Sequence, residues 1–346
     1  MNGEQIQQWS GKPTRDTTLI VQQMFAENGE IRDIELINWQ YVDCPSGAHV
    51  SIAHLHGSVH EKPVALYAVF KNKMLINGKP ALGAQSFDTL TNSEFRGRGL
   101  FKSLASEIHE NMPSHEIEVI YGVPNGSSYQ GFQKYLSWSM LDPLPMLARP
   151  IGLRYIRVRA NLRKSKLEST NSKPARCGTR IDEVPKDVSD LFARSISDNY
   201  TGVIRDYEYL NWRLKRPGAT YRLFEYRDDG GKLIAFAVYE LVMKHGCCLG
   251  YLMEIIVDRN HEDEGKQLLK SMIKEMRSRG ADLVFGWAST SSTLRRLLKS
   301  SWFIPFPEKL RPIELHFGYR ANDPAIHQSL LNQHSWSISY LDSDTV

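Results

Sequence analysis

The most informative part of the sequence is GAQSFDTLTNSEFRGRGLFKSLASEI, residues 83–108. Its first part, residues 83–91, predicts a β-strand, and Asn92-Ser93 can turn the chain or cap a helix. Apolar side chains then recur at helical spacing over residues 100–108. The stretch therefore predicts a strand, a glycine-containing loop at Arg96-Gly97-Arg98-Gly99, and an amphipathic helix.

This loop has the residues that a phosphate site needs. Gly97 and Gly99 carry no Cβ, so their backbone N–H groups can approach a ligand closely. The loop opens a helix, whose first turn carries about half a positive charge and binds anions readily. Arg96 and Arg98 add charge and bidentate donors. The loop predicts a pyrophosphate site, and the alternative is an ordinary strand–helix turn.

The chain also repeats itself, which indicates two tandem domains. Residues 31–39 and 204–212 are identical at six of nine positions. Further segments match in the same order: 62–69 with 232–238, 100–108 with 268–276, 117–123 with 281–287, and 122–138 with 286–302, the last without a gap, so that Trp138 aligns with Trp302.

Each half places a helix between strands, which predicts an α/β fold of two mixed sheets flanked by helices. We expect domains at residues 1–160 and 179–346, joined by a basic, polar linker at 161–178. The segment Arg96–Gly99 aligns with Glu264-Gly265-Lys266-Gln267. Because a glutamate there would repel pyrophosphate, only the first domain is expected to bind this group.

The loop also carries a family resemblance. Arg96-x-x-Gly99, preceded by Thr91-x-Ser93-Glu94-Phe95, resembles the acyl-CoA motif of the GNAT N-acyltransferase superfamily. Downstream, the residues from Val123 to Ser128 and from Phe132 to Trp138 resemble the next strand and helix of that family. The resemblance covers most of the first half and, through the duplication, the second half more faintly. It implies two tandem GNAT-like domains and acyl transfer from a CoA thioester.

The resemblance also implies which residues contact CoA. Leu90 and Thr91 would line the pantetheine arm, and Asn125 would contact the pantetheine or the acyl end. Backbone amides of the loop and of the first helical turn would hold the pyrophosphate. The complete expected set is Leu90, Thr91, Arg96, Gly97, Arg98, Gly99, Leu100, Phe101, Lys102, Asn125 and Phe132.

Two positions depart from the family pattern. Phe101 stands where the loop motif ends in a small residue. Phe132 aligns with the tyrosine that usually protonates the leaving thiolate, so Tyr129, one turn earlier, is the candidate acid. Tyr129 can equally be an ordinary surface or core residue. The thiolate can also leave without a protein acid, because a thiol has a pKa of about 8.5.

Residues repeated in both halves are expected to serve the shared fold, and unrepeated ones the site. Arg32-Asp33 recurs as Arg205-Asp206, which favours a buried ion pair. Asp88 aligns with Ile256 and is therefore a candidate general base, because an attacking amine must lose a proton. The alternative for Asp88 is a solvated or hydrogen-bonded carboxylate.

The acceptor is expected to contact a separate set of residues. Asn38 and Trp39 are repeated as Asn211-Trp212, yet can still reach the acceptor. His54 shares a predicted strand face with His56, near His60, and is a further candidate. The complete expected acceptor set is Asn38, Trp39, His54, Gln85 and Glu254. Glu254 is included because a carboxylate inside an apolar strand is unusual.

Composition excludes several protein classes. The formal charge of +4, from 43 basic and 39 acidic residues, is too small to indicate a nucleic-acid partner. The four cysteines lack metal or disulfide spacing, and no metal site is expected. The amino terminus does not resemble a signal peptide. The longest apolar run, 233–243, falls short of the roughly 20 residues of a membrane helix. We expect a cytoplasmic protein without a membrane partner.

The sequence thus predicts an N-acyltransferase that moves an acyl group from acetyl-CoA or a short hydroxyacyl-CoA to a primary amine. By resemblance to double-length members with this loop, the acceptor is a nucleotide-linked amino sugar, as in bacterial surface-polysaccharide synthesis. Amino-acid and peptide amines remain alternatives. A non-catalytic acyl-CoA-binding protein, or a nucleic-acid module using residues 154–180, are rivals from other classes. The oligomeric state stays open.

Overall fold

The computed structural model describes most of the chain. The described residues are 5–56, 62–124, 126, 128–141, 143–152, 178–244, 246–288, 293–307, 311, 316–332, 334 and 336–343. The predicted linker 161–178 lies outside them except for Gly178, and so do His60 and Asn125.

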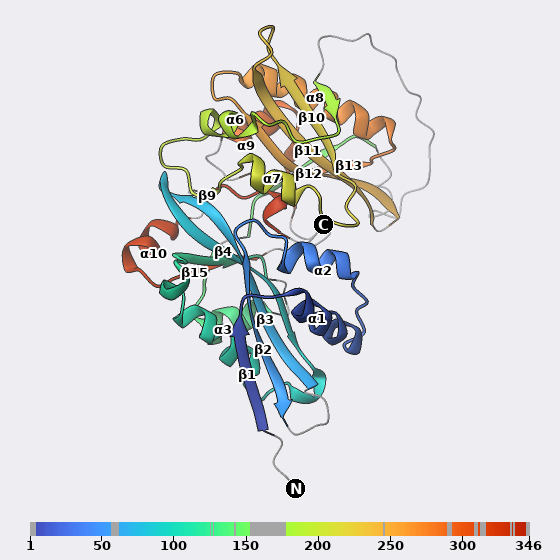
Figure 1. Ribbon diagram of the computed structural model, residues 1–346. Helices are drawn as coiled ribbons and strands as arrows, with labels where there is room; N and C mark the ends of the chain where they lie inside the picture. The colour runs from blue at the N-terminus through green and yellow to red at the C-terminus, as the bar shows by residue number, and fades with distance from the viewer. Residues whose placement is uncertain are drawn as a thin grey trace.

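Two sheets organise the molecule, one for each repeat (Figure 1). The first sheet runs, from edge to edge, β1 (Gln5–Gly11), β2 (Ala48–His56), β3 (Lys62–Ile76), β4 (Lys79–Thr91), β5 (Val119–Gly122), β15 (Phe317–Ala321) and β6 (Ser139–Leu141), with β9 (Gly202–Val203) paired to β3. The second runs β14 (Ile304–Pro305), β7 (Met146–Pro150), β13 (Leu283–Trp287), β12 (Cys247–Val257), β11 (Leu233–Lys244), β10 (Arg222–Arg227) and β8 (Thr179–Ile181). Both sheets are mixed, as predicted, because β4–β5 and β12–β13 are parallel and the other pairs of the two paths antiparallel.

The two sheets exchange strands. β7 follows the first sheet in the chain but pairs with β13 and β14 of the second. β15, near the carboxyl terminus, returns to the first sheet between β5 and β6 (Figure 1). Each sheet is thus built mainly from one of the predicted segments, 1–160 or 179–346, and borrows from the other. Because backbone ladders would have to break, the halves cannot separate without unfolding.

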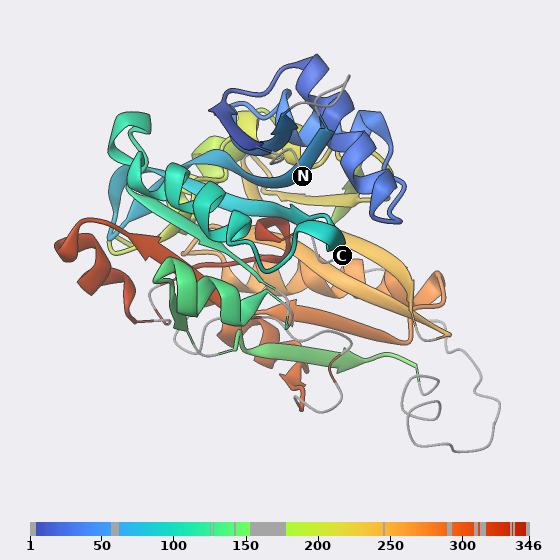
Figure 2. The same cartoon turned by 90° about the horizontal axis from the view of Figure 1, so that it is seen from below.

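Helices cover the outer faces of both sheets (Figure 2). On the first sheet these are α3 (Leu100–Glu110) and α4 (Tyr129–Leu136), which pack on Tyr67 and Ala84. On the second they are α8 (Glu262–Ser278) and α9 (Thr293–Ser300). The remaining helices are α1 (Arg15–Glu27), α2 (Ile34–Tyr41), α6 (Val188–Ser195), α7 (Tyr207–Arg213) and α10 (Pro324–Leu330), and short 3₁₀ turns are η1 (Ser93–Phe95), η2 (Pro113–His115) and η5 (Tyr340–Asp342).

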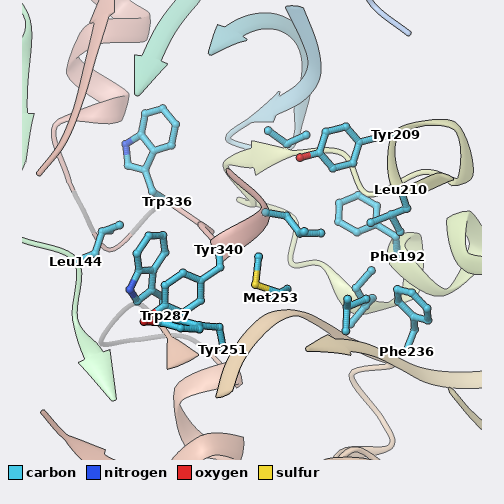
Figure 3. Close-up of a cluster of buried hydrophobic side chains, with 14 of the residues drawn as sticks. Leu144, Phe192, Tyr209, Leu210, Phe236, Tyr251, Met253, Trp287, Trp336 and Tyr340 are labelled. Carbon is cyan, nitrogen blue, oxygen red and sulfur yellow. The ribbon is translucent and has the colours of Figure 1, made fainter. Parts of the chain in front are cut away.

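The inner faces of the sheets share one large core (Figure 3). The carboxyl-terminal segment fills its centre, where Tyr340 stacks on Trp287 with ring centroids 4.0 Å apart. Trp336 lies against Tyr121 and Phe317 of the first sheet. Burial of these rings, each worth a few kcal/mol, holds the two halves in a fixed arrangement.

The repeated segments 31–39 and 204–212 meet at the contact between the halves. The indoles of Trp39 and Trp212 stack with centroids 4.9 Å apart. Each donates its Nε1–H to the carbonyl oxygen of the other, at 2.9 and 3.0 Å. Both are buried. This reciprocal pair explains the repeated tryptophan by packing between the halves.

The repeated aspartates begin helices. The Asp33 carboxylate accepts from the amide of Glu35 at the start of α2, and Asp206 accepts from Tyr209 at the start of α7. The sequence prediction that Arg32 pairs with Asp33 is therefore wrong in its partner, because a side-chain oxygen at this position satisfies a helix amide that otherwise has none. Within the described residues, no helix has the length and hydrophobicity needed to cross a membrane.

Candidate active site

The first sheet opens at its centre. β4 and β5 pair only through Gly83–Val119, Ala84–Ile120 and Gln85–Tyr121. β5 then ends at Gly122, while β4 continues to Thr91 with only β3 beside it. A bulge that leaves Phe87 unpaired with β3 bends β4 at this point. The segment 86–91 therefore has no strand partner on the β5 side, and a groove can form between the diverging strands.

Gln85, predicted to contact the acceptor, lies at the last paired position. Its side chain is buried, and its Oε1 has no hydrogen-bond partner among the described residues. A buried acceptor without a donor is costly, about 1–3 kcal/mol. A ligand N–H at the point of divergence would remove this cost.

The predicted loop follows β4 directly. Gly97 and Gly99 have left-handed φ angles of 78° and 79°, and a Cβ built on either would meet no atom within 4 Å. Gly99 is the N-cap of α3 and provides no side-chain cap. The first turn of α3 contains no acidic residue. The amides of this turn have no intrahelical partner by geometry, so the loop presents exposed donors to solvent.

The two arginines of the loop adopt different roles. Arg98 lies over the ring of Phe95, 4.7 Å from its centroid. The Nε of Arg96 donates to the carbonyl oxygen of Thr91 at 3.2 Å. Arg96 thus ties the end of β4 to the loop, and both arginines are exposed.

The same place in the second half has opposite chemistry. α8 begins with Glu262, Asp263 and Glu264 in its first turn. A Cβ on Gly265 would lie 2.8 Å from the side chain of Val257, so this glycine serves close packing. Three carboxylates at a helix amino terminus disfavour a second anion there. The contrast supports the predicted difference between the halves.

Asp88, the predicted base, is engaged by neighbours. Both of its oxygens accept from Nη1 of Arg32 at 2.9 Å, and Oδ2 also accepts from the Tyr41 hydroxyl at 2.9 Å. Burial and the Asp88 charge raise the pKa of Tyr41 well above its usual value. Although burial opposes it, the Asp88 and Glu30 carboxylates raise the pKa of Arg32. These contacts favour a structural role for Asp88.

The structure also corrects the alignment of Asp88. On β3, Ala68 pairs with Asp88, and on β11 the matching Val238 pairs with Glu254. Asp88 is therefore equivalent to Glu254 and not to Ile256. Glu254 bonds Arg205 at 2.6 Å, as Asp88 bonds the equivalent Arg32. The arginine–carboxylate pair belongs to the duplicated fold.

The two aromatic residues of α4 at the predicted site, Phe132 and Tyr129, differ in burial and in their neighbours. Phe132 is buried, with its ring 5.3 Å from that of Phe101 and 4.5 Å from that of Trp138. Phe101 fills the space beside Gly131, where a Cβ would lie 3.1 Å from its ring. Phe101 and Phe132 thus form an aromatic floor below the loop. Tyr129 is partly exposed and lies against His316, with centroids 4.3 Å apart.

The candidate acceptor residues do not form one cluster. His54 lies on β2, two strands from β4, opposite Gln7. Asn38 and Trp39 line a shallow groove of about 380 Å³ between the halves, and the Asn38 Oδ1 accepts from Thr18. No cluster of potential metal ligands occurs among the described residues.

A cavity of about 490 Å³ lies in the second half. It forms at the end of β12, the equivalent of the open end of β4, and its lining includes Arg205, Glu254, Asp258 and Trp336. Trp336 also contacts Tyr121 at the point where β4 and β5 diverge, with ring centroids 6.2 Å apart. Sequence reasoning missed the part of the lining near the carboxyl terminus, because no local motif marks His334 or residues 336–339.

A buried charge cluster borders this cavity. Arg205 bonds Glu254 at 2.6 Å and Asp342 at 2.5 Å, and a second bond joins it to the Ser339 hydroxyl. All three charged side chains are less than a tenth exposed. Two carboxylates therefore surround one guanidinium, and Asp342 Oδ1 has no partner among the described residues.

Comparison with solved structures shows the fold. An Enterococcus faecalis protein described as a probable N-acyltransferase matches 91% of this chain over 73% of its own, with a TM-score of 0.63 and 13% identity. A GCN5-related N-acetyltransferase from Anabaena variabilis matches 92% of this chain over 74% of its own, with a TM-score of 0.63 and 12% identity. Saccharomyces cerevisiae N-myristoyltransferase, with bound myristoyl-CoA, matches 91% of this chain over 79% of its own, with a TM-score of 0.56 and 15% identity.

These likenesses confirm the predicted fold class, two tandem GNAT-like units with mixed sheets and flanking helices. At 12–15% identity they bear on the fold alone. No protein-family model and no curated protein matches the sequence.

Proposed function

We propose that the protein transfers an acyl group from a CoA thioester to a primary amine. The observation that carries this proposal is the open loop at Arg96–Gly99, whose left-handed glycines and first helical turn present unobstructed amides beside diverging strands. Pyrophosphate would bind these amides. Pantetheine would follow β4 past Leu90 and Thr91 toward the buried Gln85. Fold neighbours described as N-acyltransferases, one with bound myristoyl-CoA, support this donor class.

The reaction would be direct attack in a ternary complex. The amine nitrogen forms a bond with the thioester carbonyl carbon, the carbon–sulfur bond breaks, and CoA leaves as a thiolate. The amine gives up its proton to water or to a side chain. Phe132 has no proton to donate, so Tyr129 or solvent protonates the thiolate, which needs little assistance because a thiol is already acidic. Asn125, the predicted contact of the acyl end, lies outside the described residues.

The 490 Å³ cavity is the proposed acceptor site. The cluster of Glu254, Arg205 and Asp342 carries one more carboxylate than guanidinium, which favours a cationic partner such as the ammonium form of the acceptor. Trp336 joins this cavity to the divergence of β4 and β5. A nucleotide-linked amino sugar remains the acceptor class that we propose from sequence resemblance, with amino-acid and peptide amines as alternatives.

A thiol-release assay tests the function. Acetyl-CoA and short hydroxyacyl-CoAs are offered with amines that include nucleotide-linked amino sugars, and free thiol should form only when both substrates are present. Gly99→Asp should remove CoA binding, because a carboxylate about 4 Å from a phosphate costs about 4 kcal/mol at an effective dielectric of 20, or about a thousandfold in affinity.

Gly280→Asp is the matched control, since Gly280 also has a left-handed φ, of 83°, with open space around its Cβ position. It imposes the same backbone strain in the second half and should leave CoA binding within about threefold. Equal loss of binding in both variants would contradict the loop assignment.

A non-catalytic acyl-CoA-binding protein is the second candidate. The observation that favours it is the buried Phe132, which occupies the place of the usual acid within the aromatic floor. Tight CoA binding without amine-dependent thiol release, over the full amine panel, would support this candidate over the enzyme.

A further inference from the structure

The second sheet ends in an exposed apolar tip formed by Trp302 and Ile304. Trp302 is 79% exposed and Ile304 is 55% exposed. Ile304 begins β14, the edge strand of the sheet. Trp302 has a left-handed φ of 65°, which is strained for a residue with a side chain. An exposed indole recovers none of this cost by burial.

The first half shows what the fold alone requires at this place. After α4, Ser137 adopts a φ of 54° and is followed by the buried Trp138. After α9, Trp302 adopts the left-handed φ and is followed by the buried Phe303. Trp302 is thus equivalent to Ser137, and the ungapped alignment with Trp138 is wrong by one residue. Because serine adopts the same left-handed turn in the first half, packing does not explain the tryptophan in the second.

Three basic side chains are linked to the tip through its neighbours. Arg149, beside the strand partner of Ile304, donates from Nη1 to the carbonyl oxygen of Ser301 at 2.7 Å. Burial and the nearby Arg277 lower the pKa of Arg149. Lys299, exposed, lies in the last turn of α9, the helix that leads to Trp302. Within the described part of the chain, neither Arg277 nor Lys299 forms an ion pair with a carboxylate.

We propose that this tip, Trp302 and Ile304 with the basic rim of Arg149, Arg277 and Lys299, docks on an anionic lipid bilayer. Tryptophan favours the membrane–water interface, and isoleucine favours the acyl region below it. Each basic side chain near an anionic surface adds electrostatic attraction, and salt weakens this attraction by screening. Such peripheral contact needs no membrane-spanning segment and is independent of acyl transfer.

Other occupants fit less well. A second copy docked tip to tip would place the basic side chains of the two copies against one another, and this repulsion is unfavourable. The phosphates of a nucleic acid would pair with the basic side chains, and its nucleobases would stack on the indole. A nucleic acid offers no apolar environment for Ile304, however. A lipid surface matches both the charges and the aliphatic side chain.

Sedimentation of the full chain with phosphatidylcholine vesicles, with and without phosphatidylserine, tests the proposal. The protein should bind only the anionic vesicles, more weakly at high salt, with a blue shift of tryptophan emission. Trp302→Ser installs the residue of the first half and should weaken binding by about tenfold or more, because a buried indole contributes at least about 1.5 kcal/mol.

Tyr135→Ser is the matched control, since Tyr135 is an aromatic residue 50% exposed on α4, and it should leave vesicle binding unchanged. Equal melting temperatures of both variants and the parent would establish that each is folded. No binding to anionic vesicles at low salt, or equal binding by Trp302→Ser, would overturn the proposal. So would binding to RNA without vesicle binding, or a Trp302-dependent dimer in place of vesicle binding.

Discussion

Asp88→Asn gives the sharpest test of whether this carboxylate holds the fold or removes a proton. In the structure, Asp88 neutralises Arg32, whose side chain is 22% exposed, and accepts from buried Tyr41. Breaking a fully buried pair costs about 3–5 kcal/mol. Because Arg32 is partly solvated and keeps Glu30 at 2.6 Å, the lower end of that range applies, about 3 kcal/mol.

This loss can be expressed as a melting shift. Unfolding entropy is about 2.1 cal/mol/K per residue, so 346 residues give about 0.7 kcal/mol/K if the strand-exchanged halves unfold together. A loss of about 3 kcal/mol then lowers the melting temperature by about 4 °C. Calorimetry would measure this shift, and CoA affinity, measured by titration calorimetry, should stay within about threefold.

Glu254→Gln is the matched variant at the equivalent position. Arg205 keeps Asp342 as an ionised partner after this change, so the remaining pair is balanced. We expect a loss of only about 1 kcal/mol, the size of one hydrogen bond, although Glu254 and Asp88 are buried to about the same extent. The reasoning would be refuted if Asp88→Asn left the melting temperature unchanged and lowered the acyl-transfer rate by about a hundredfold, as loss of a general base does.

Two further predictions follow from buried groups. Trp39→Phe and Trp212→Phe each remove one of two reciprocal hydrogen bonds and should each lower the unfolding free energy in urea by about 1 kcal/mol; a loss confined to one variant would contradict the paired arrangement. Burial and the nearby His115 lower the pKa of His49 to about 4, and burial and Arg320 lower that of His109 to about 3. Since unfolded histidine titrates near pH 6.5, the unfolded state binds more protons below that value. Stability is therefore complete above about pH 6.5 and falls as the pH drops toward 4. Urea denaturation at several pH values would measure this fall, His49→Asn should reduce it, and a flat profile would count against it.

The local features of this protein followed directly from its amino-acid sequence. The strand, glycine loop and helix at residues 83–108 could be predicted because backbone conformation and helical periodicity are set by neighbouring residues. The duplication was equally visible, since it repeats residue types at fixed spacing. Together they identified the fold class and the half that carries the open loop.

Contacts between distant residues were established only by the folded structure. Arg32 forms its ion pair with Asp88, 56 positions away, and not with its neighbour Asp33, because Asp33 caps a helix. β4 and β12 carry the same bulge against β3 and β11, so Asp88 and Glu254 occupy equivalent places, although the sequence alignment sets them two residues apart. The exchange of β7 and β15 depends on pairing between strands far apart in the chain. Such contacts depend on packing and charge compensation in the folded core, which leave no local pattern in the sequence.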